Sequence, residues 1–280
     1  MATTRKPLLS PNFNHGPGRM DVNYYDCHSF AIRPMFWLKL AVAVLFSVIM
    51  LPAQDLPAGT ALPMMLNSTL DAKKDKPGEK IEGKIMQDVP LPSGGQIKSG
   101  SHVIGHVVSV GKPGVAGSRI AVIFNQIEDH GQVIHLSVNL RALASTESVF
   151  DAKLPMGNQS DTESSNEWMT KQVGGDVVNR GRGVVASSTG IVGRYTGSGV
   201  WGKLTPGLDA DCPATIGNDS EQALWLFSTS ACGVYGLRDV KLTHDGSTDP
   251  LGQIELQSDK DLVIRGGSGW LLLVNAPVTH

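Results

Sequence analysis

A short glycine motif recurs three times in this sequence, at residues 56–62, 97–103 and 264–270. In each copy an aliphatic residue is followed three places on by Gly, then by Ser or Thr, and two places later by a large apolar residue. Glycine tolerates the positive φ that tight turns often need, and the alternation that follows suits a half-buried strand. The motif therefore predicts three turns that lead into strands, at Gly59-Thr60, Gly100-Ser101 and Gly267-Ser268. The alternative is chance recurrence in a chain with 32 glycines.

Length and charge limit the function classes. A chain of 280 residues can hold one large or two ordinary domains. Hydrophobic residues make up 41% of the chain and charged residues 18%, which is typical of a globular protein with many turns. The formal net charge of -2 gives no electrostatic basis for binding nucleic acid, so we exclude nucleic acid as a partner.

The N-terminal region has the pattern of an export signal. Lys39 precedes an apolar run at residues 40–51, which is short for a bilayer span and has the length of a signal-peptide core. We therefore predict a signal peptide at residues 36–53, cleavage after Ala53, and a periplasmic or secreted mature protein. Met35 stands directly before this segment, and we hypothesise that translation begins there. The alternative is an uncleaved leader that anchors the chain in the inner membrane, which is the one membrane contact we expect.

Cysteine usage agrees with export. Cys27 would be lost with the leader, which leaves Cys212 and Cys232 as an even pair. In an oxidising compartment they would close a loop of about twenty residues, worth about 3 kcal/mol in the chain-entropy model. Neither has a CxxC partner, so we expect no thioredoxin-like site and no four-cysteine zinc site. The alternative is two buried free thiols.

Residues 56–143 have the pattern of an antiparallel β module. Apolar and polar residues alternate in several short runs, and Gly, Pro and charged residues separate them. The runs lie at 81–89, 103–110, 119–127 and 134–140, and the last has the clearest alternation. Several short strands with turns between them predict a mainly β fold, as a small antiparallel barrel or sandwich.

Short glycine-based motifs follow one another through this module. They are Leu56-Pro-Ala-Gly-Thr, Pro77-Gly-Glu, Ile97-Lys-Ser-Gly-Ser-His-Val-Ile-Gly105, Gly117-Ser-Arg-Ile-Ala-Val and Gly131-Gln-Val-Ile. In this order they resemble the C-terminal β-barrel of the TrbI-like proteins of conjugation and type IV secretion channels. The resemblance covers about a third of the chain and implies a barrel that helps to form a ring at the outer membrane. The Pro-rich periplasmic arm and the apolar helical hairpin of that family are not recognisable here, and the overall layout also resembles uncharacterised exported bacterial β proteins.

The rest of the chain divides by composition. The run at 158–167 has no apolar residue, so burial of apolar surface cannot offset the conformational entropy that ordering it would cost. The sequence thus predicts a leader at 1–53, the β module at 56–143, a polar linker at 144–176 and a second β-rich region at 177–280. Residues 270–274 are apolar on both faces, so we hypothesise that residues 262–274 return to complete the sheet of the first module.

The second β-rich region is expected to carry one short helix. Residues 221–227 present a broad apolar face after Asp219 or Ser220, either of which can cap a helix. Trp201 and Trp225 are the candidate ligand-facing residues of this region. The alternative is that both are core residues.

No catalytic constellation is recognisable in the sequence. His102 and His106 would lie about 13 Å apart along a strand, which is too far to share one metal ion. The Gly181-x-Gly183 segment matches a dinucleotide fingerprint but is not followed by a helix start or by the acidic residue that the fingerprint needs. We therefore expect no catalytic residue, no metal ligand and no cofactor.

Three functions remain open from the sequence. The favoured one is a non-enzymatic cell-envelope protein whose β module mediates assembly, either with other envelope proteins or by self-association. The second is a periplasmic module that binds a glycan or a peptide through Trp201 or Trp225. The third is a hydrolase with an unrecognised site, and it ranks last because no nucleophile and base can be paired.

Overall fold

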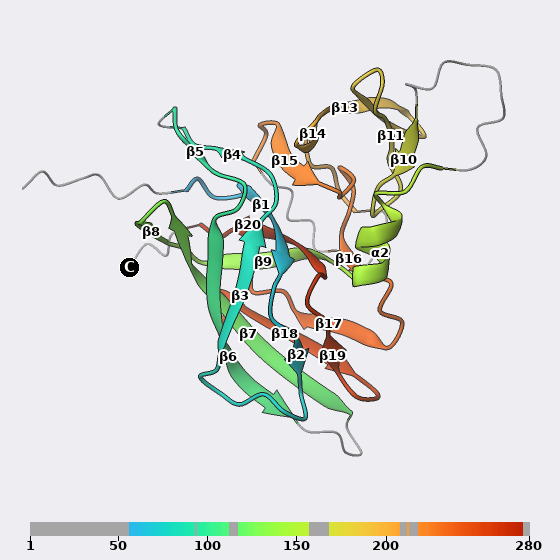
Figure 1. Cartoon of the computed structure of the whole chain (residues 1–280). Helices are drawn as coiled ribbons and strands as arrows, with labels where there is room; N and C mark the ends of the chain where they lie inside the picture. The colour runs from blue at the N-terminus through green and yellow to red at the C-terminus, as the bar shows by residue number, and fades with distance from the viewer. Residues whose placement is uncertain are drawn as a thin grey trace, which may run out of the picture. The chain divides into compact units, whose positions relative to one another are not determined.

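The computed structural model describes residues 56–92, 94–111, 117–156, 168–207, 212 and 218–276. The predicted leader and the polar run at 158–167 lie outside these residues. The described chain consists mainly of β-strands, which confirms the predicted fold class (Figure 1). Within the described residues, no helix is long and apolar enough to cross a membrane.

The larger sheet has ten strands in the described residues and forms a nearly closed barrel (Figure 1). All neighbours pair antiparallel except the first two, which are parallel. The order is β16 (Gly233–Tyr235), β9 (Val138–Ala144), β20 (Gly269–Val274), β1 (Ala61–Leu66), β3 (Lys80–Ile85), β6 (His102–Gly111), β7 (Ser118–Asp129), β18 (Gln253–Ser258) and β17 (Val240–His244), and β8 (Gln132–His135) pairs with β7.

The smaller sheet has six antiparallel strands and forms a half-barrel. Its strands pair in chain order: β10 (Met169–Lys171), β11 (Val177–Asn179), β12 (Val184–Ser187), β13 (Gly190–Thr196), β14 (Gly199–Gly202) and β15 (Gln222–Trp225). Two short strand pairs complete the described β-structure: β2 (Leu70–Asp71) with β19 (Val263–Ile264), and β4 (Val89–Pro90) with β5 (Gln96–Ile97). The helix α2 (Thr146–Asp151) begins after Ser145, whose side chain accepts a hydrogen bond from the Ser148 N–H.

Strand β20 takes part in two apolar cores. Trp270 and Leu272 face the inside of the barrel, where the Trp270 ring meets Phe124 edge-on at a centroid distance of 5.5 Å. Leu271 and Leu273 face the other way and belong to a core shared with α2 and the smaller sheet. All six residues of the strand are buried, and each large apolar side chain contributes about 1.5–3 kcal/mol.

The pairing of β20 is the one that the returning-strand hypothesis requires. It lies between β1 and β9, and β19 pairs with β2. Strands β16, β17 and β18 also join the larger sheet. The region from residue 233 onward therefore belongs largely to the barrel, rather than to a second module as the composition suggested.

The three predicted turns have one geometry. The glycines at positions 59, 100 and 267 have φ values of 76°, 104° and 90°. A backbone N–H then donates to the carbonyl three residues earlier, which together with the positive φ identifies a type II turn. These hydrogen bonds are Thr60 to Pro57 at 3.1 Å, Ser101 to Lys98 at 3.1 Å and Ser268 to Arg265 at 3.2 Å.

Each turn is also bonded to the end of a neighbouring strand. The glycine N–H donates a hydrogen bond to the carbonyl of one residue in that strand. The N–H of that same residue donates a hydrogen bond to the carbonyl of the Ser or Thr in the turn. We call these units clamp turns. Their partners are Val274 for the turn at Gly59, Ile85 for Gly100 and Leu66 for Gly267.

A fourth clamp turn lies at Gly78, which has a φ of 84°. The Glu79 N–H donates to Lys76, and Gly78 and Glu79 exchange the same pair of hydrogen bonds with Val107. The sequence motif did not include it, because Asp75 and Glu79 stand where the other copies have an aliphatic residue and Ser or Thr. The pairs β1–β20 and β3–β6 are therefore closed at both ends by clamp turns.

Two local predictions were wrong. Residues 221–227 do not form a helix, because Gln222–Trp225 is the strand β15, buried on both faces. A short apolar run of this kind does not distinguish a buried strand from a helix. The run at 134–140 is also broken: β8 ends at His135 and pairs with β7, whereas β9 starts at Val138 and pairs with β20.

The segment predicted as a linker is partly folded. Its described residues include α2 and β10, and α2 is the short helix that the sequence placed elsewhere. The apolar side chain of Val149 in α2 is buried in the second core, so packing stabilises a helix of only six residues. The disulfide between Cys212 and Cys232 is present, as predicted.

We predict that Gly100→Ala destabilises the protein by about 1–2 kcal/mol, because an L-residue resists the positive φ at this position. A Cβ there would have room, since its nearest neighbour is Lys84 Cε at 3.7 Å. Urea unfolding of the variant measures the loss. Gly95→Ala is the matched control, because its Cβ would meet only Leu91 Cδ1 at 3.8 Å and its φ is not in the left-handed region. Equal stability of the two variants would contradict the clamp-turn geometry.

Ser101 joins its clamp turn to the end of β7. Its hydroxyl donates to the Asp129 carboxylate at 2.7 Å, and His130 Nδ1 lies 2.7 Å from the same oxygen. Partial burial of Asp129 favours its neutral form, but these hydrogen bonds outweigh burial and hold the pKa of Asp129 below its ordinary value.

We predict that Asp129→Asn costs about 1 kcal/mol of unfolding free energy near pH 7 and that the cost shrinks in acid. The folded pKa lies below the unfolded one, so the stabilisation is complete above about pH 4 and is lost as the pH falls through the folded pKa. Urea unfolding at several pH values measures the difference from the parent protein. Asp259→Asn, at an exposed carboxylate 3.7 Å from Lys241, is the control and should change little. A cost for Asp129→Asn that stays constant in acid would contradict this account.

Candidate functional site

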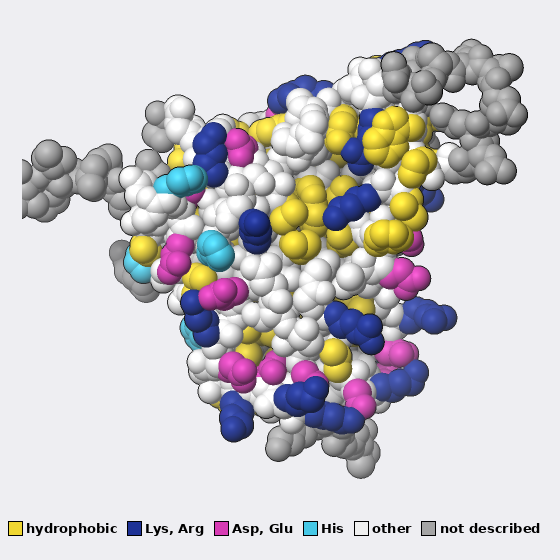
Figure 2. Space-filling model, in the orientation of Figure 1, with side chains coloured by type: hydrophobic (Ala, Val, Ile, Leu, Met, Phe, Trp, Pro, Cys, Tyr) yellow, Lys and Arg dark blue, Asp and Glu magenta, His cyan; other side chains and the backbone are white. Residues whose placement is uncertain are grey.

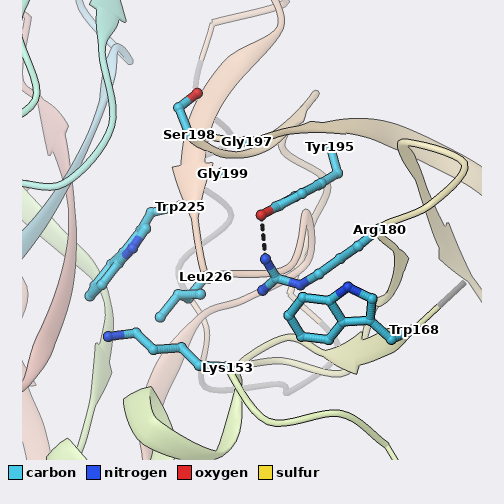
Figure 3. Close-up of a pocket in the computed structure, with 9 residues that line it drawn as sticks. All are labelled: Lys153, Trp168, Arg180, Tyr195, Gly197, Ser198, Gly199, Trp225 and Leu226. Atoms are coloured by element: carbon cyan, nitrogen blue, oxygen red, sulfur yellow. Dashed lines mark hydrogen bonds between the residues drawn. The ribbon is translucent and has the colours of Figure 1, made fainter. Parts of the chain in front are cut away.

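A pocket of about 280 Å³ opens on the smaller sheet (Figure 3). Its wall combines aromatic and basic side chains, and residues 197–199 of the β13–β14 turn close one side. The side chains that line it include Lys153, Trp168, Arg180, Tyr195, Trp225 and Leu226. They come from the residues after α2 and from the ends of several strands, so only the folded sheet brings them together.

Arg180 is held between two aromatic rings. Its Cζ lies 4.6 Å from the ring centroid of Trp168 and 4.6 Å from that of Tyr195. Its Nη1 donates to the Tyr195 hydroxyl (Figure 3). Its Nε donates to Thr170 Oγ1 at 3.4 Å. These contacts fix the orientation of the guanidinium group before any ligand arrives.

A second cation faces a second ring. Lys153 Nζ lies 5.5 Å from the ring centroid of Trp225, and Lys153 is exposed. No acidic side chain is among the residues that line the pocket in the described part of the chain. The pocket therefore offers positive charge beside apolar ring faces.

Trp225 forms the floor in an unusual backbone conformation. It is only 6% exposed and has a φ of 53°, which is uncommon for a residue other than glycine. It lies where the register between β14 and β15 shifts. Strain of this kind persists only where the surroundings enforce it, and it is often found at functional sites.

Gln87 is the residue that enforces this conformation. It lies between β3 and β4 and is fully buried. Its Oε1 accepts a hydrogen bond from the Trp225 N–H at 2.7 Å, and its Nε2 donates to the Val200 carbonyl at 3.0 Å. A side chain from the barrel region thus holds both strands of the pocket floor.

Gly199 makes room for that contact. Its φ is 145°, and a Cβ at this position would lie 2.3 Å from Gln87 Oε1 and 3.0 Å from Trp225 Cα. Any other residue here would displace the Gln87 amide or the Trp225 backbone. The floor therefore depends on a glycine, a buried amide and a strained tryptophan acting together.

Exposed apolar side chains lie on the two segments that supply Lys153 and Trp168 to the pocket. We call them the apolar rim: Phe150, Leu154, Met156, Trp168 and Met169. The two methionines are adjacent, because the Met156 N–H donates to the Met169 carbonyl at 2.8 Å. Figure 2 shows hydrophobic side chains gathered beside Lys and Arg over this part of the molecule. Exposed apolar side chains in such a cluster typically mark a binding surface.

The residues singled out from the sequence fall in different places. Trp225 lines the pocket and is also largely buried, and its contact with a ligand stays a prediction. Trp201 does not line the pocket: it packs against the barrel core, and its Nε1 donates to Thr196 Oγ1 at 3.2 Å. The residues of the predicted turns belong to the clamp turns of the barrel, and none of them lines the pocket.

Sequence reasoning missed most of the pocket. Lys153, Arg180 and Tyr195 stand far apart in the chain and form no motif with recognisable spacing. Gln87 interrupts the apolar alternation of its strand region, and this interruption was the one available signal of its role. Among the described residues, no group of three or more His, Cys, Asp or Glu side chains is placed to hold a metal ion.

Comparison with known proteins gives no assignment. No protein-family model matches the sequence, and no curated protein matches it.

We predict that Gln87→Leu destabilises the protein by about 2–3 kcal/mol, because the buried Trp225 N–H and Val200 carbonyl both lose their partner. Urea unfolding followed by tryptophan fluorescence measures this loss. Gln132→Leu, at an exposed position in β8, is the control and should stay within about 0.5 kcal/mol of the parent protein. A Gln87→Leu variant as stable as the control would show that this amide does not hold the pocket floor.

Proposed function

We propose that this protein is an exported, non-enzymatic protein of the cell envelope that binds another envelope protein through one docking surface. The docking surface consists of the aromatic and basic pocket together with the apolar rim. The observation that carries the proposal is the concentration of exposed apolar side chains on the segments that supply Lys153 and Trp168 to that pocket. Aromatic residues, Met and Arg are the types enriched in protein interfaces, and all of them occur here.

The disulfide and the sequence support export. A disulfide between Cys212 and Cys232 fits an oxidising compartment such as the periplasm or the extracellular space. The apolar segment at residues 36–53 supplies the signal peptide in this proposal. The TrbI-like resemblance of residues 56–143 belongs to the same proposal, with the barrel as the part that assembles in the envelope.

A second candidate function is a module that binds a glycan. The ring faces of Trp168 and Trp225 favour it, because sugars stack on aromatic rings. The apolar rim favours a protein partner instead, since it offers few hydrogen-bonding groups for sugar hydroxyls.

In-cell photocrosslinking tests the docking surface. We predict that a photoreactive residue at Met156 crosslinks to an envelope protein and that the double variant Phe150→Ser, Leu154→Ser removes most of the adduct. Both side chains are exposed, by 60% and 44%, so the variant should fold normally.

Ile191 and Val133 are the matched controls, because they are exposed apolar residues outside the docking surface. Ile191→Ser and Val133→Ser should leave the adduct unchanged. An adduct that survives the Phe150→Ser, Leu154→Ser variant would contradict the proposal. So would an adduct formed only with a second copy of the chain, since the partner would then be the protein itself.

A further inference from the structure

We propose that the pocket binds an acidic peptide segment, with one carboxylate side chain in the pocket that Lys153 and Arg180 line and its apolar neighbours on the rim. This inference rests on the proposed protein-binding function and names the chemistry of the partner. Three features of the described residues carry it: the charge of the pocket, its size and the construction of its floor.

The charge of the pocket selects an anion. Lys153 and Arg180 both line it, and no lining side chain is acidic. Aromatic rings lie beside both cations, and Arg180, which two rings contact, is half-buried, whereas Lys153 remains exposed. A carboxylate that enters would form charge-assisted hydrogen bonds in partly dehydrated surroundings, where such bonds are strong.

The guanidinium group of Arg180 is already oriented. The rings of Trp168 and Tyr195 hold its faces, and the hydroxyl groups of Tyr195 and Thr170 accept from its nitrogens. A group that is fixed before binding loses little conformational entropy when the ligand arrives. The arrangement therefore favours a carboxylate that approaches in one direction over a diffuse ionic contact.

The size of the pocket suits one side chain. Pockets for drug-sized ligands range from about 300 to 1,000 Å³, and this one, at about 280 Å³, is smaller. A glutamate or aspartate side chain fits this space, whereas several linked sugars would not. The apolar rim then receives the residues on either side of the acidic one, because its side chains are exposed and lie on the segments that carry Lys153 and Trp168.

The floor of the pocket contains backbone strain that packing alone does not require. Trp225 has a positive φ, and there is no space for a side chain at Gly199. The buried amide of Gln87 uses both its oxygen and its nitrogen for hydrogen bonds to the two strands of the floor. Backbone strain that is held in place by a buried hydrogen bond is characteristic of pre-formed binding sites. The orientation of the Trp225 ring beneath Lys153 follows from it.

Tryptophan indole signals in nuclear magnetic resonance test this inference on the purified full chain. The probes are acetyl-Phe-Glu-Phe-amide and its neutral counterpart acetyl-Phe-Gln-Phe-amide. We expect the glutamate peptide to shift the indole signals of Trp168 and Trp225 and to bind about ten-fold more tightly than the glutamine peptide. Trp201 and Trp270 do not line the pocket, so their signals should stay in place and report an intact fold.

Substitutions of the two cations test whether their charges recognise the carboxylate. Lys153→Met and Arg180→Met should each reduce the preference for the glutamate peptide to near zero, and raised salt should weaken it in the parent protein. Lys84→Met is the control, because Lys84 is an exposed lysine of β3 that does not line the pocket. An unchanged Trp270 signal shows that the Arg180→Met variant remains folded.

Three results would overturn the inference, and they bear differently on the proposed function. Equal binding of the two peptides would refute the acidic ligand and leave a protein partner in place. The absence of binding by either peptide, with photocrosslinks that still depend on Phe150, would do the same. Binding of D-galacturonate at Trp168 and Trp225, with no binding of either peptide, would refute both the acidic peptide and the protein-binding function.

Discussion

The backbone pairing of β1 with β20 joins the beginning of the described chain to its end. Five residue pairs, from Ala61 with Leu273 to Met65 with Gly269, bring together segments about two hundred residues apart. A clamp turn closes this pair at each end, so that the register is set by backbone hydrogen bonds as well as by side-chain packing. The barrel depends on it, because β9 and β3 attach to the outer edges of the pair.

The same pairing connects the barrel to the pocket. Strand β20 is apolar on both faces, so its outward side chains need a second layer, which α2 and the smaller sheet provide. Gln87 follows β3 of the barrel and crosses to the smaller sheet, where it holds Trp225 and Val200. The pocket floor is therefore positioned by the barrel, although none of the described lining residues belongs to a barrel strand. In the proposed function the barrel serves as the rigid support and the docking surface makes the contact.

The sequence predicted those features that depend on neighbouring residues. A glycine followed by Ser or Thr predicted three turns, which the structure shows to be clamp turns, and a strand apolar on both faces suggested the returning position of β20. It did not identify β15 as a strand, because a short buried apolar run satisfies a helix and a strand equally. It also joined β8 to β9, since alternation continues through the break at Leu136 while the pairing partner changes.

The candidate site could not be predicted from the sequence, whereas much of the fold could. The sequence by itself determined a mainly β chain, the turn positions and the cysteine pair, because local backbone preference and side-chain alternation are written in adjacent residues. Only the tertiary structure decided that Lys153, Arg180 and Trp225 share one pocket. The β-strand pairings that bring these residues together are long-range, and each residue alone looks like an ordinary surface cation or core aromatic. The spacing of these residues along the chain does not indicate that they lie close together, because strand pairing within the sheet brings them together and local sequence does not.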